Sequence, residues 1–242
     1  MKFDDLRKLH QKKFREEFGH FLVEGEHLVL ELQRAAQRDP RFRQCEVYVT
    51  HEFGAWQSPF PVHVINARQM AQVSETREPQ GIFAVVPLPS PPAPVAAGEV
   101  AVCLHQVQDP GNLGTILRTL AWFGGYRCLL TAGSVELFNA KAIRASMGAV
   151  FHVPVETGVA LDSLPARYRR IACLGTRGAS IQTAGFRDFD CYVFGSEAHG
   201  LSDDAVASLG AELFTIPGSG AIESLNLATA ASLCAYELAR TH

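Results

Sequence analysis

Short apolar runs alternate with longer amphipathic stretches through the second half of the chain. The runs are almost continuous in apolar residues, and they span 100–104, 127–131, 170–174, 191–194 and 213–216. Helical patterns fall between them, and a last one covers about 224–240. Continuous apolar strands separated by helices are typical of a mainly parallel sheet covered on both faces. Because ligands collect at the carboxyl ends of such strands, we expect the chemistry in the loops that follow them.

The first part of the chain shows a weaker form of the same alternation. After a charged N-terminal helix, the pattern predicts strands at 21–23, 45–49 and 82–86 and a helix at 26–37. Within the second of these strands, Cys45, Val47 and Val49 alternate with polar neighbours, as in a half-buried strand. Strands that alternate with helices indicate a small α/β sandwich.

A proline-rich segment separates the two patterns. Five of the eight residues from Pro87 to Pro94 are proline, so the segment cannot join a helix or a central strand. We therefore predict an α/β protein with a small domain at 1–86, a linker at 87–98 and a larger domain at 99–242. The linker marks a boundary at which the larger domain is expected to fold on its own.

Composition is that of a folded protein, with 47% hydrophobic and 19% charged residues in 242. No apolar run approaches the length of a membrane span, and the N-terminus has no apolar core of a signal peptide. We therefore expect a cytoplasmic protein with no membrane partner.

Cysteine and histidine spacing argues against a metal site. No pair among the six cysteines has CxxC spacing, and most lie in apolar runs, so we expect buried free thiols. The nine histidines show no HExxH or comparable spacing. The sequence therefore predicts no metal.

The net charge of −3 counts mildly against a nucleic-acid partner, because binding to a phosphate backbone usually needs a basic face. Clustering can supply such a face. Residues 2–15 hold six basic side chains and only two acidic ones, Asp4 and Asp5. Alone, this cluster is better explained as a solvated helix face. The basic residues are Lys2, Arg7, Lys8, Lys12, Lys13 and Arg15.

Three loops after strands carry polar residues. The first, 106–118, combines Asp-Pro-Gly-Asn turn chemistry with a helix start, where we expect Asn112 as the cap and Arg118 one and a half turns further on. The second, 195–201, turns through two glycines, which let a ligand approach the backbone, and Ser202 can cap the next helix. Each is equally consistent with an ordinary turn or a capped helix.

The third loop, 216–226, is glycine-rich and delivers polar side chains onto the terminal helix. Exposed amides and a helix N-terminus favour anions, so a phosphate cradle is one interpretation. The loop lacks the Gly-Lys-Ser/Thr ending of a P-loop and the spacing of a dinucleotide fingerprint. Those two enzyme classes are therefore disfavoured.

Together and in this order, the three loops resemble the signature motifs of the SpoU (TrmH) branch of the SPOUT RNA methyltransferases. The first motif corresponds to Asn112-x-Gly114-x-x-x-Arg118 and the second to 195–201. The third corresponds to Ile216-Pro217 followed by Glu223-Ser224-Leu225-Asn226. Residues 139–149 are similar to an intermediate helix of the family, and 21–25 and 79–81 to its ribosomal-protein-like substrate-binding domain. The resemblance thus covers nearly the whole chain.

The resemblance implies an S-adenosylmethionine-dependent transfer of a methyl group to a ribose 2′-hydroxyl. It also implies a C-terminal domain with a deep trefoil knot, a feature too rare to propose from pattern. The implied cofactor pocket is walled by Leu174, Gly175, Thr176, Gly195, Ile216 and Leu225.

The resemblance places Arg118 beside the reacting hydroxyl and gives Asn112 the task of fixing the target strand. An arginine is hard to deprotonate, so we favour electrostatic stabilisation over a role as general base. Glu197, Ser224 and Asn226 would orient Arg118 and the ribose; their plainer role is to cap loops and the terminal helix.

The family also implies an active site assembled across a homodimer, with RNA on a shared basic surface. The expected RNA-binding residues are Lys8, Lys12, Lys13, Arg15 and Arg144. Two positions depart from the family pattern: His105 stands where an acidic residue is common, and Gly218 where methionine is common. These departures leave the substrate open, not the class of reaction.

Several alternatives remain at this point. A separate N-terminal domain and the lack of a long C-terminal tail favour 23S ribosomal RNA over transfer RNA. A non-catalytic RNA-binding factor for ribosome assembly is disfavoured by the presence of Asn112, Arg118, Glu197 and Asn226 together. A nucleotide-dependent oxidoreductase is disfavoured by the missing GxGxxG pattern. The target nucleotide stays open, as does the choice between housekeeping modification and antibiotic resistance.

Overall fold

The computed structural model describes residues 2–93 and 98–240, which form two compact units. The first unit holds residues up to Ser90 together with Phe138–His152, and the second holds Pro91–Leu137 and Val153–His242. The linker expected at 87–98 is only partly described, because 94–97 lie outside the described residues. Its first residue, Pro87, is the last residue of a strand. The boundary at residue 99 stays a prediction about autonomous folding.

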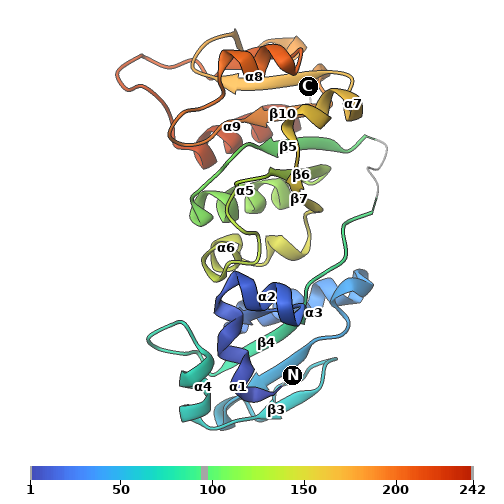
Figure 1. The fold of residues 1–242 in the computed structure, drawn as a ribbon, viewed down its shortest axis with the longest axis vertical. Coiled ribbons are helices and arrows are strands. Elements are labelled where there is room, and N and C mark those ends of the chain that lie inside the picture. Colours follow the sequence, from blue (N-terminus) through green and yellow to red (C-terminus); the bar gives the residue numbers. More distant parts are fainter. Residues whose placement is uncertain (1, 94–97, 241–242) are drawn as a thin grey trace. The chain divides into compact units, whose positions relative to one another are not determined.

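The first unit is a four-stranded sheet with helices on both faces (Figure 1). Its strand order is β1-β4-β2-β3, with antiparallel pairs except between β2 and β3. The strands are β1 (His20–Glu24), β2 (Glu46–Val49), β3 (Val62–Val64) and β4 (Ile82–Pro87). The main helices are α1 (Phe3–Leu6), α2 (Lys12–Phe18), α3 (Glu26–Arg38), α4 (Ala67–Val73) and α6 (Ala140–Ser146), with 3₁₀ turns η1 (Arg7–His10), η2 (Pro40–Phe42), η3 (His51–Phe53) and η4 (Ala149–Phe151).

Alternation along the strands divides the core of this unit into two layers. Leu22, Tyr48 and Phe83 face one side, where they pack against apolar residues of α1, η1 and α4. Their neighbours in sequence face the other side, where α3 lies over β1 and β4. The predicted small α/β sandwich is therefore confirmed. The charged N-terminal helix is not continuous, because Gln11 adopts an extended conformation between η1 and α2.

The second unit is built on a seven-stranded sheet of order β7-β6-β5-β10-β8-β11-β9, in which every described pair is parallel. Its strands are β5 (Val100–Leu104), β6 (Tyr126–Thr131), β7 (Val155–Val159), β8 (Ile171–Gly175), β9 (Ala179–Ser180), β10 (Cys191–Phe194) and β11 (Glu212–Thr215). Its helices are α5 (Pro110–Phe123), α7 (Leu164–Arg167), α8 (Asp203–Ser208) and α9 (Leu227–Ala239), with 3₁₀ turns η5 (Leu161–Ser163) and η6 (Ala184–Asp188). The predicted mainly parallel sheet is confirmed.

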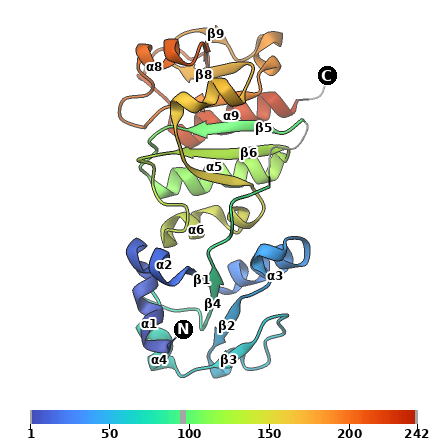
Figure 2. The same cartoon turned by 45° about the vertical axis from the view of Figure 1, so that its right-hand side comes forward.

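Helices cover both faces of this sheet (Figure 2). Alternate residues of the central strands, such as Cys103, Cys173 and Val193, pack with residues of α7 and α8 in one cluster. On the other face α5 lies against β6 and α9 lies against α5. The Thr119 and Ser232 hydroxyls hydrogen-bond at 2.8 Å between α5 and α9, and the Tyr126 hydroxyl donates to the Ala235 carbonyl at 3.2 Å. The C-terminal helix is thus fixed beside the first helix of the unit.

The strands that the sequence did not predict are short, exposed or interrupted. β3 has three residues, two of them exposed, and follows Pro61. β7 contains Gly158 and two exposed residues, and it lies at the edge of the sheet. An edge strand buries little apolar surface, so its sequence needs no apolar run.

Segment 138–152 belongs to the first unit although it lies far along the chain. The Phe138 and Phe21 ring centroids are 4.4 Å apart, and those of Phe151 and Phe42 are 5.4 Å apart. Gly148, with a φ of +93°, approaches Glu31 so closely that a Cβ would lie 2.6 Å from the Glu31 Cβ. The proline-rich segment is therefore not the only connection that a truncation would cut.

We expect a chain reduced to residues 98–242 to associate through apolar surface that the first unit normally covers. Removal of the N-terminal part takes away Phe21 and Phe42 and so uncovers Phe138 and Phe151, and exposed apolar patches promote aggregation. Light scattering should show large particles for the truncated chain and fewer for the same chain carrying Phe138→Ser and Phe151→Ser. If both truncated chains are equally monodisperse, the covering role of the first unit is contradicted.

Candidate active site

Three loops meet at the carboxyl edge of the second sheet because of its parallel register. Phe194, the last residue of β10, lies opposite Leu104 of β5 and Leu174 of β8. Phe214 of β11 in turn lies opposite Leu174. The loops after β5, β10 and β11 therefore start from one edge, as ligand-binding loops of parallel sheets do.

A chain of hydrogen bonds ties these three loops together. The Asn112 amide Nδ2 donates to Glu197 Oε1 at 3.0 Å, and the Asn226 Nδ2 donates to Asn112 Oδ1 at 2.9 Å. Glu197 also accepts from the backbone amides of Gln108 at 3.1 Å and Asp109 at 3.2 Å. Asn112, Glu197 and Asn226, predicted as site residues from three separate motifs, are thus brought into direct contact.

The helix that follows β5 is capped by Asp109 and not by Asn112. The Asp109 carboxylate accepts from the Asn112 backbone amide at 2.8 Å, and Pro110 begins α5. The expectation that Asn112 is the cap was wrong, because an Asp-Pro pair supplies both the preferred cap and the preferred first helical residue. The Asn112 side chain is thereby left to join Glu197 and Asn226.

Asn226 has two tasks at once. Its Oδ1 accepts from the backbone amides of Ala228 at 2.9 Å and Thr229 at 3.2 Å, which caps α9. Its Nδ2 donates to Asn112. An aspartate could perform the first task but not the second, since a carboxylate has no proton to donate.

The carboxyl group of Glu197 is held in its charged form. Burial raises its pKa, but hydrogen bonds from Asn112 and from the Gln108 and Asp109 amides outweigh burial and leave the pKa below the usual value. At neutral pH this side chain is therefore an acceptor only, which fixes the Asn112 amide with its nitrogen toward Glu197.

Gly195 is required by the tightness of the second loop. A Cβ on Gly195 would lie 2.1 Å from the backbone carbon of Gly200, closer than any real contact. Ser196 and Gly200 form an isolated bridge that closes the turn. The backbone of this loop can therefore approach a ligand without a side chain in between.

Two predicted catalytic residues do not join the hydrogen-bonded chain. Arg118 lies exposed on α5, and its guanidinium has no hydrogen bond or ion pair to any described residue. Ser224 is exposed in the third loop, and its hydroxyl likewise has no hydrogen bond to any described residue. Both side chains are free to meet a substrate, and the structure leaves their roles as predictions.

The third loop has free backbone groups that suit a purine and a ribose. Within the described parts of the chain, no backbone-to-backbone hydrogen bond involves residues 217–224, although the Ala221 amide donates to the Ser219 hydroxyl at 3.4 Å. Two apolar side chains of this loop stay exposed, Ile222 at 72% and Leu225 at 43%. An adenosine needs such apolar contact together with unpaired amide and carbonyl groups. Ile216 is half-buried at the start of the loop. Leu174 and Gly175 end the adjacent strand β8, and Thr176 follows it.

The expected RNA-binding residues differ in how far they are available. Arg15 is only 3% exposed and donates to the Leu9 carbonyl at 2.6 Å, so the structure contradicts its assignment to an RNA surface. The α2 helix turns it inward, which the cluster of charges in the sequence does not reveal. Lys8 pairs with Asp5 at 2.8 Å, Lys12 lies 3.7 Å from Glu16, and Arg144 lies 3.6 Å from Glu75.

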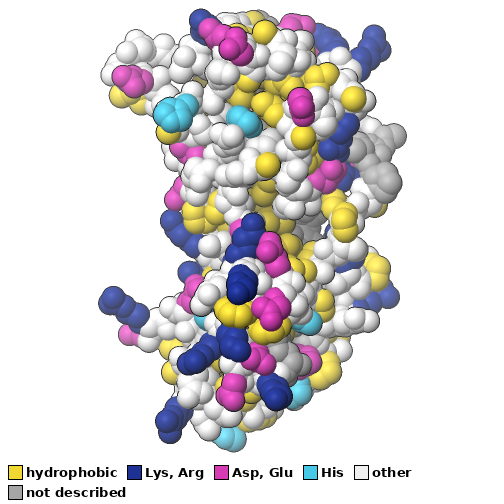
Figure 3. Space-filling view, viewed as in Figure 1, with side chains coloured by type: hydrophobic (Ala, Val, Ile, Leu, Met, Phe, Trp, Pro, Cys, Tyr) yellow, Lys and Arg dark blue, Asp and Glu magenta, His cyan; other side chains and the backbone are white. Residues whose placement is uncertain are grey.

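Basic and acidic side chains interleave over α1 and α2 (Figure 3). The face is therefore less positive than the lysine and arginine count of the segment suggests. Lys13 keeps its ammonium over the Phe14 ring at 5.7 Å, and no described carboxylate pairs with it.

Sequence reasoning did not predict the unusual backbone conformation at the start of the loop between β5 and α5. Gln106 has a φ of +53°, which is rare for a residue with a side chain. Its backbone amide donates a hydrogen bond to the Thr131 hydroxyl at 3.0 Å. His105 also lies 3.2 Å from that hydroxyl through its Nδ1, and burial lowers its pKa. The signal in the sequence was the departure from the family pattern at His105.

Together, the parallel sheet and the three joined loops at its carboxyl edge define a methyltransferase of the SPOUT class. Residues 99–236 match the model of the SpoU rRNA methylase family, and residues 2–84 match that of the MRM3-like substrate-binding domain. The chain therefore belongs to the SpoU rRNA methylase family. It is an S-adenosylmethionine-dependent RNA methyltransferase.

Several known proteins are similar over nearly the full chain. The 23S rRNA (guanosine(2553)-2′-O)-methyltransferase RlmP of Bacillus subtilis is 31% identical, over 98% of this chain and 95% of its own. Mitochondrial rRNA methyltransferase 3 of Mus musculus is 26% identical, over 93% of this chain and 68% of its own. The AdoMet-bound rRNA methyltransferase of Sinorhizobium meliloti has a TM-score of 0.82 and 25% identity, over 98% of this chain and 93% of that one.

In residues 2–93 and 98–240, no group of three or more histidine, cysteine, aspartate or glutamate side chains is placed to hold a metal ion. No helix in the same ranges has both the length and the apolar character needed to cross a membrane.

We predict that Glu197→Gln removes an acid-sensitive part of the stability. The pKa of Glu197 is lower in the folded protein than its usual value of 4.5. Its carboxylate therefore contributes stability that is complete above 4.5 and is lost as the pH falls through the folded pKa. The difference in unfolding free energy between wild type and variant should be largest at neutral pH and shrink on acidification.

Denaturant titrations at a series of pH values measure this difference. Glu223→Gln is the matched control, since it removes an exposed carboxylate that has no hydrogen bond to a described residue. A difference that stays constant with pH would show that the charge of Glu197 does not hold the loops together.

Proposed function

We propose that this enzyme methylates a ribose 2′-hydroxyl in large-subunit ribosomal RNA. The support is the match of residues 99–236 to the SpoU rRNA methylase family and the naming of the Bacillus subtilis relative as a 23S rRNA 2′-O-methyltransferase. A solved structure whose description concerns 2-OH methylation of C/U34 on tRNA covers only 59% of this chain, at 29% identity and a TM-score of 0.53. A transfer RNA target or a non-catalytic assembly role is therefore less well supported.

The observation that carries the proposal is the hydrogen-bonded chain from Glu197 through Asn112 to Asn226. Asn112 shares the helix α5 with Arg118, and Asn226 ends the loop that carries Ser224. When bound, S-adenosylmethionine would supply the electrophilic methyl group, with the thioether sulfur of S-adenosylhomocysteine as the leaving group and the hydroxyl proton passing to water. The backbone of Gly195, Ile216 and Leu225, with a wall at Leu174, Gly175 and Thr176, would hold its adenosine. Asn112, fixed from both sides, would position the target strand.

Arg118 would act as an electrostatic stabiliser in this scheme. An arginine keeps its proton at physiological pH, so its guanidinium can hydrogen-bond the ribose oxygen as negative charge develops and can hold the neighbouring phosphate. Its lack of a partner among the described residues leaves all its donors available. Ser224 would orient the ribose from the third loop.

We also infer a homodimer in which one protomer completes the site of the other. Trp122 is 84% exposed on α5, and Leu233 and Tyr236 are 40% and 57% exposed on the adjacent α9. Arg118 lies four residues before Trp122 on α5 and therefore on the same face of that helix. A second copy bound at this face would lie beside Arg118.

The knot and the RNA surface complete the proposal. α9 follows β11 near one end of the sheet but packs on α5 beside β5 and β6, and we propose that this return forms the trefoil knot of the family. Lys8, Lys12, Lys13 and Arg144 would contact RNA phosphates, with Arg15 excluded. The bacterial relative is named as a 23S rRNA methyltransferase, which supports a cytoplasmic location for this chain.

The function is tested by methyl transfer from labelled S-adenosylmethionine to 23S rRNA transcribed in vitro, with transfer RNA transcripts as the comparison. A 2′-O-methyl group blocks attack on the adjacent phosphodiester, so alkaline hydrolysis should leave the label in an alkali-stable dinucleotide. Label in a mononucleotide would indicate base methylation, and label in transfer RNA alone would move the substrate to that class.

Arg118→Ala should lower the turnover rate by about a hundredfold to a thousandfold, which is the usual effect of removing one donor to a developing oxyanion. The affinity for S-adenosylmethionine should stay unchanged in calorimetry, because the cofactor residues lie on other loops. Arg118→Lys serves as the control that keeps the charge. Loss of cofactor affinity in step with turnover would show that Arg118 belongs to the cofactor pocket.

Trp122→Ser should weaken the dimer by about 2 kcal/mol or more, as expected for a central interface tryptophan. Sedimentation velocity measures the shift, and activity should fall with the dimer fraction. Val64→Ser is the control, since Val64 is a 50% exposed apolar residue of the first unit. Unchanged association of the Trp122 variant would place the interface elsewhere.

A further inference from the structure

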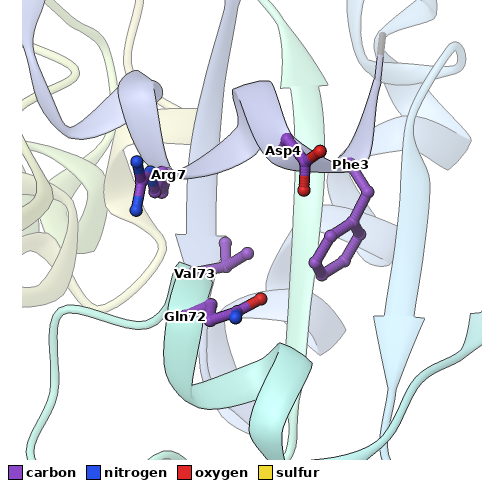
Figure 4. Close-up of a pocket in the computed structure, with 5 residues that line it drawn as sticks. All are labelled: Phe3, Asp4, Arg7, Gln72 and Val73. Carbon is purple, nitrogen blue, oxygen red and sulfur yellow. The ribbon is translucent and has the colours of Figure 1, made fainter.

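A hollow of about 310 Å³ opens in the first unit between the N-terminal segment and the end of α4 (Figure 4). Phe3, Asp4 and Arg7 line it from one side, and Gln72 and Val73 line it from the other. Its volume is at the lower end of the range for small-ligand sites, about 300–1,000 Å³. None of its residues belongs to the loops of the candidate active site.

The two walls of this hollow are fastened to each other and to the core. His10, at the end of η1, hydrogen-bonds the Val73 carbonyl through Nε2 at 2.5 Å. The Phe3 ring lies 6.1 Å from Tyr48, which stacks on Phe83 at 5.0 Å. Val73 is 2% exposed. The hollow is therefore preformed, with an apolar floor that ends an aromatic column.

The rim of the hollow carries polar side chains that make no hydrogen bond or ion pair with described residues. Arg7 and Gln72 are exposed, and neither side chain has a hydrogen bond or ion pair within the described residues. Arg68 precedes Gln72 by four residues on α4, so it lies on the same face of that helix and adds a second cation without a described partner. Asp4 supplies an acceptor on the opposite side.

We propose that this hollow binds one unpaired nucleotide of the RNA substrate, an inference that rests on the proposed function. The base would lie against the half-buried Phe3 ring, as unstacked bases do on aromatic side chains. Arg7, supported by Arg68, would hold the adjoining phosphate, because an arginine fork matches phosphate oxygens. Gln72 and Asp4 would face the base edge, and Asp4 favours a base with an exocyclic amino group.

Charge and shape favour RNA over a protein partner at this place. A peptide-binding groove is mostly apolar and extended, whereas this hollow is lined by five residues, among them one arginine without a described partner and a single aromatic ring. The basic cluster of α2 belongs to the same unit, so a strand bound at Arg7 would have further cations available at Lys12 and Lys13.

The first test is binding of 23S rRNA transcribed in vitro to the full-length protein, measured by filter retention over a range of salt. Arg7→Ala should weaken binding about tenfold, the usual effect of losing one charge-assisted hydrogen bond. It should also reduce the salt slope by about 0.7, as for one phosphate contact with a single strand. Arg38→Ala, an exposed arginine of α3 on the other face of the sheet, should change neither.

The base contact is tested by Phe3→Leu and Gln72→Ala. Phe3→Leu keeps an apolar side chain in the core but removes the ring, so binding should weaken about tenfold while thermal stability stays near that of wild type. Ultraviolet cross-linking of the wild-type complex should attach a nucleotide to the peptide that carries Phe3, and Phe3→Leu should abolish that adduct. Wild-type RNA affinity in Arg7→Ala and Phe3→Leu, or an adduct elsewhere only, overturns the proposal.

Kinetics separate this inference from the proposed function. In the methyl-transfer assay Arg7→Ala should raise the KM for RNA and leave kcat and S-adenosylmethionine affinity unchanged. If 23S rRNA accepts no methyl group, the proposed substrate is wrong, whereas the cross-link still reports whether the hollow holds a nucleotide. If Arg7→Ala instead loses a copurifying protein and keeps its RNA affinity, the hollow is a protein site and the proposal fails.

Discussion

The carboxylate of Glu197 is the interaction on which the arrangement of the active site depends. It accepts the Asn112 amide and the backbone amides of Gln108 and Asp109, and Asn112 in turn accepts from Asn226. Three loops that leave different strands are thereby held by one charged group. A neutral or protonated side chain at this position could not satisfy all three donors.

This constraint reaches beyond the loops because the same residues begin the helices. Asp109 caps α5 and Asn226 caps α9, and the two helices are joined by the hydroxyls of Thr119 and Ser232. A shift of either cap would move a helix, and a shift of either helix would move the Asn112–Asn226 contact. The site and the packing of the C-terminal helix therefore stabilise each other, a coupling that a polar network of this kind makes possible.

The sequence predicted those parts of the structure that bury apolar surface in a regular pattern. The central strands β5, β6, β8, β10 and β11 were found within one residue of their observed ends, since buried parallel strands need continuous apolar residues. The edge strands β3 and β7 were missed because exposure removes that requirement. The sequence did not indicate that segment 138–152 groups with the first unit, because packing such as Phe138 on Phe21 leaves no local pattern.

The site was predictable to a different depth for different residues. Motif order identified Asn112, Glu197 and Asn226 as site residues. It did not show whether Asp109 or Asn112 caps α5, because both are turn residues that can accept from a helix N-terminus. The basic N-terminal segment was misleading for Arg15, because a helical face is determined by how the helix docks and not by the number of charges in it.

The way in which the N-terminal segment 2–18 packs on the first sheet also explains how it can contribute both to the core and to a binding surface. Leu6 and Leu9 point inward, and each is 1% exposed. The break at Gln11 then turns α2 relative to η1, so Arg7 stays outward while Arg15 turns in and donates to the Leu9 carbonyl. The buried Arg15 fixes the break from within, and the break leaves Arg7 at the rim of the hollow beside Phe3.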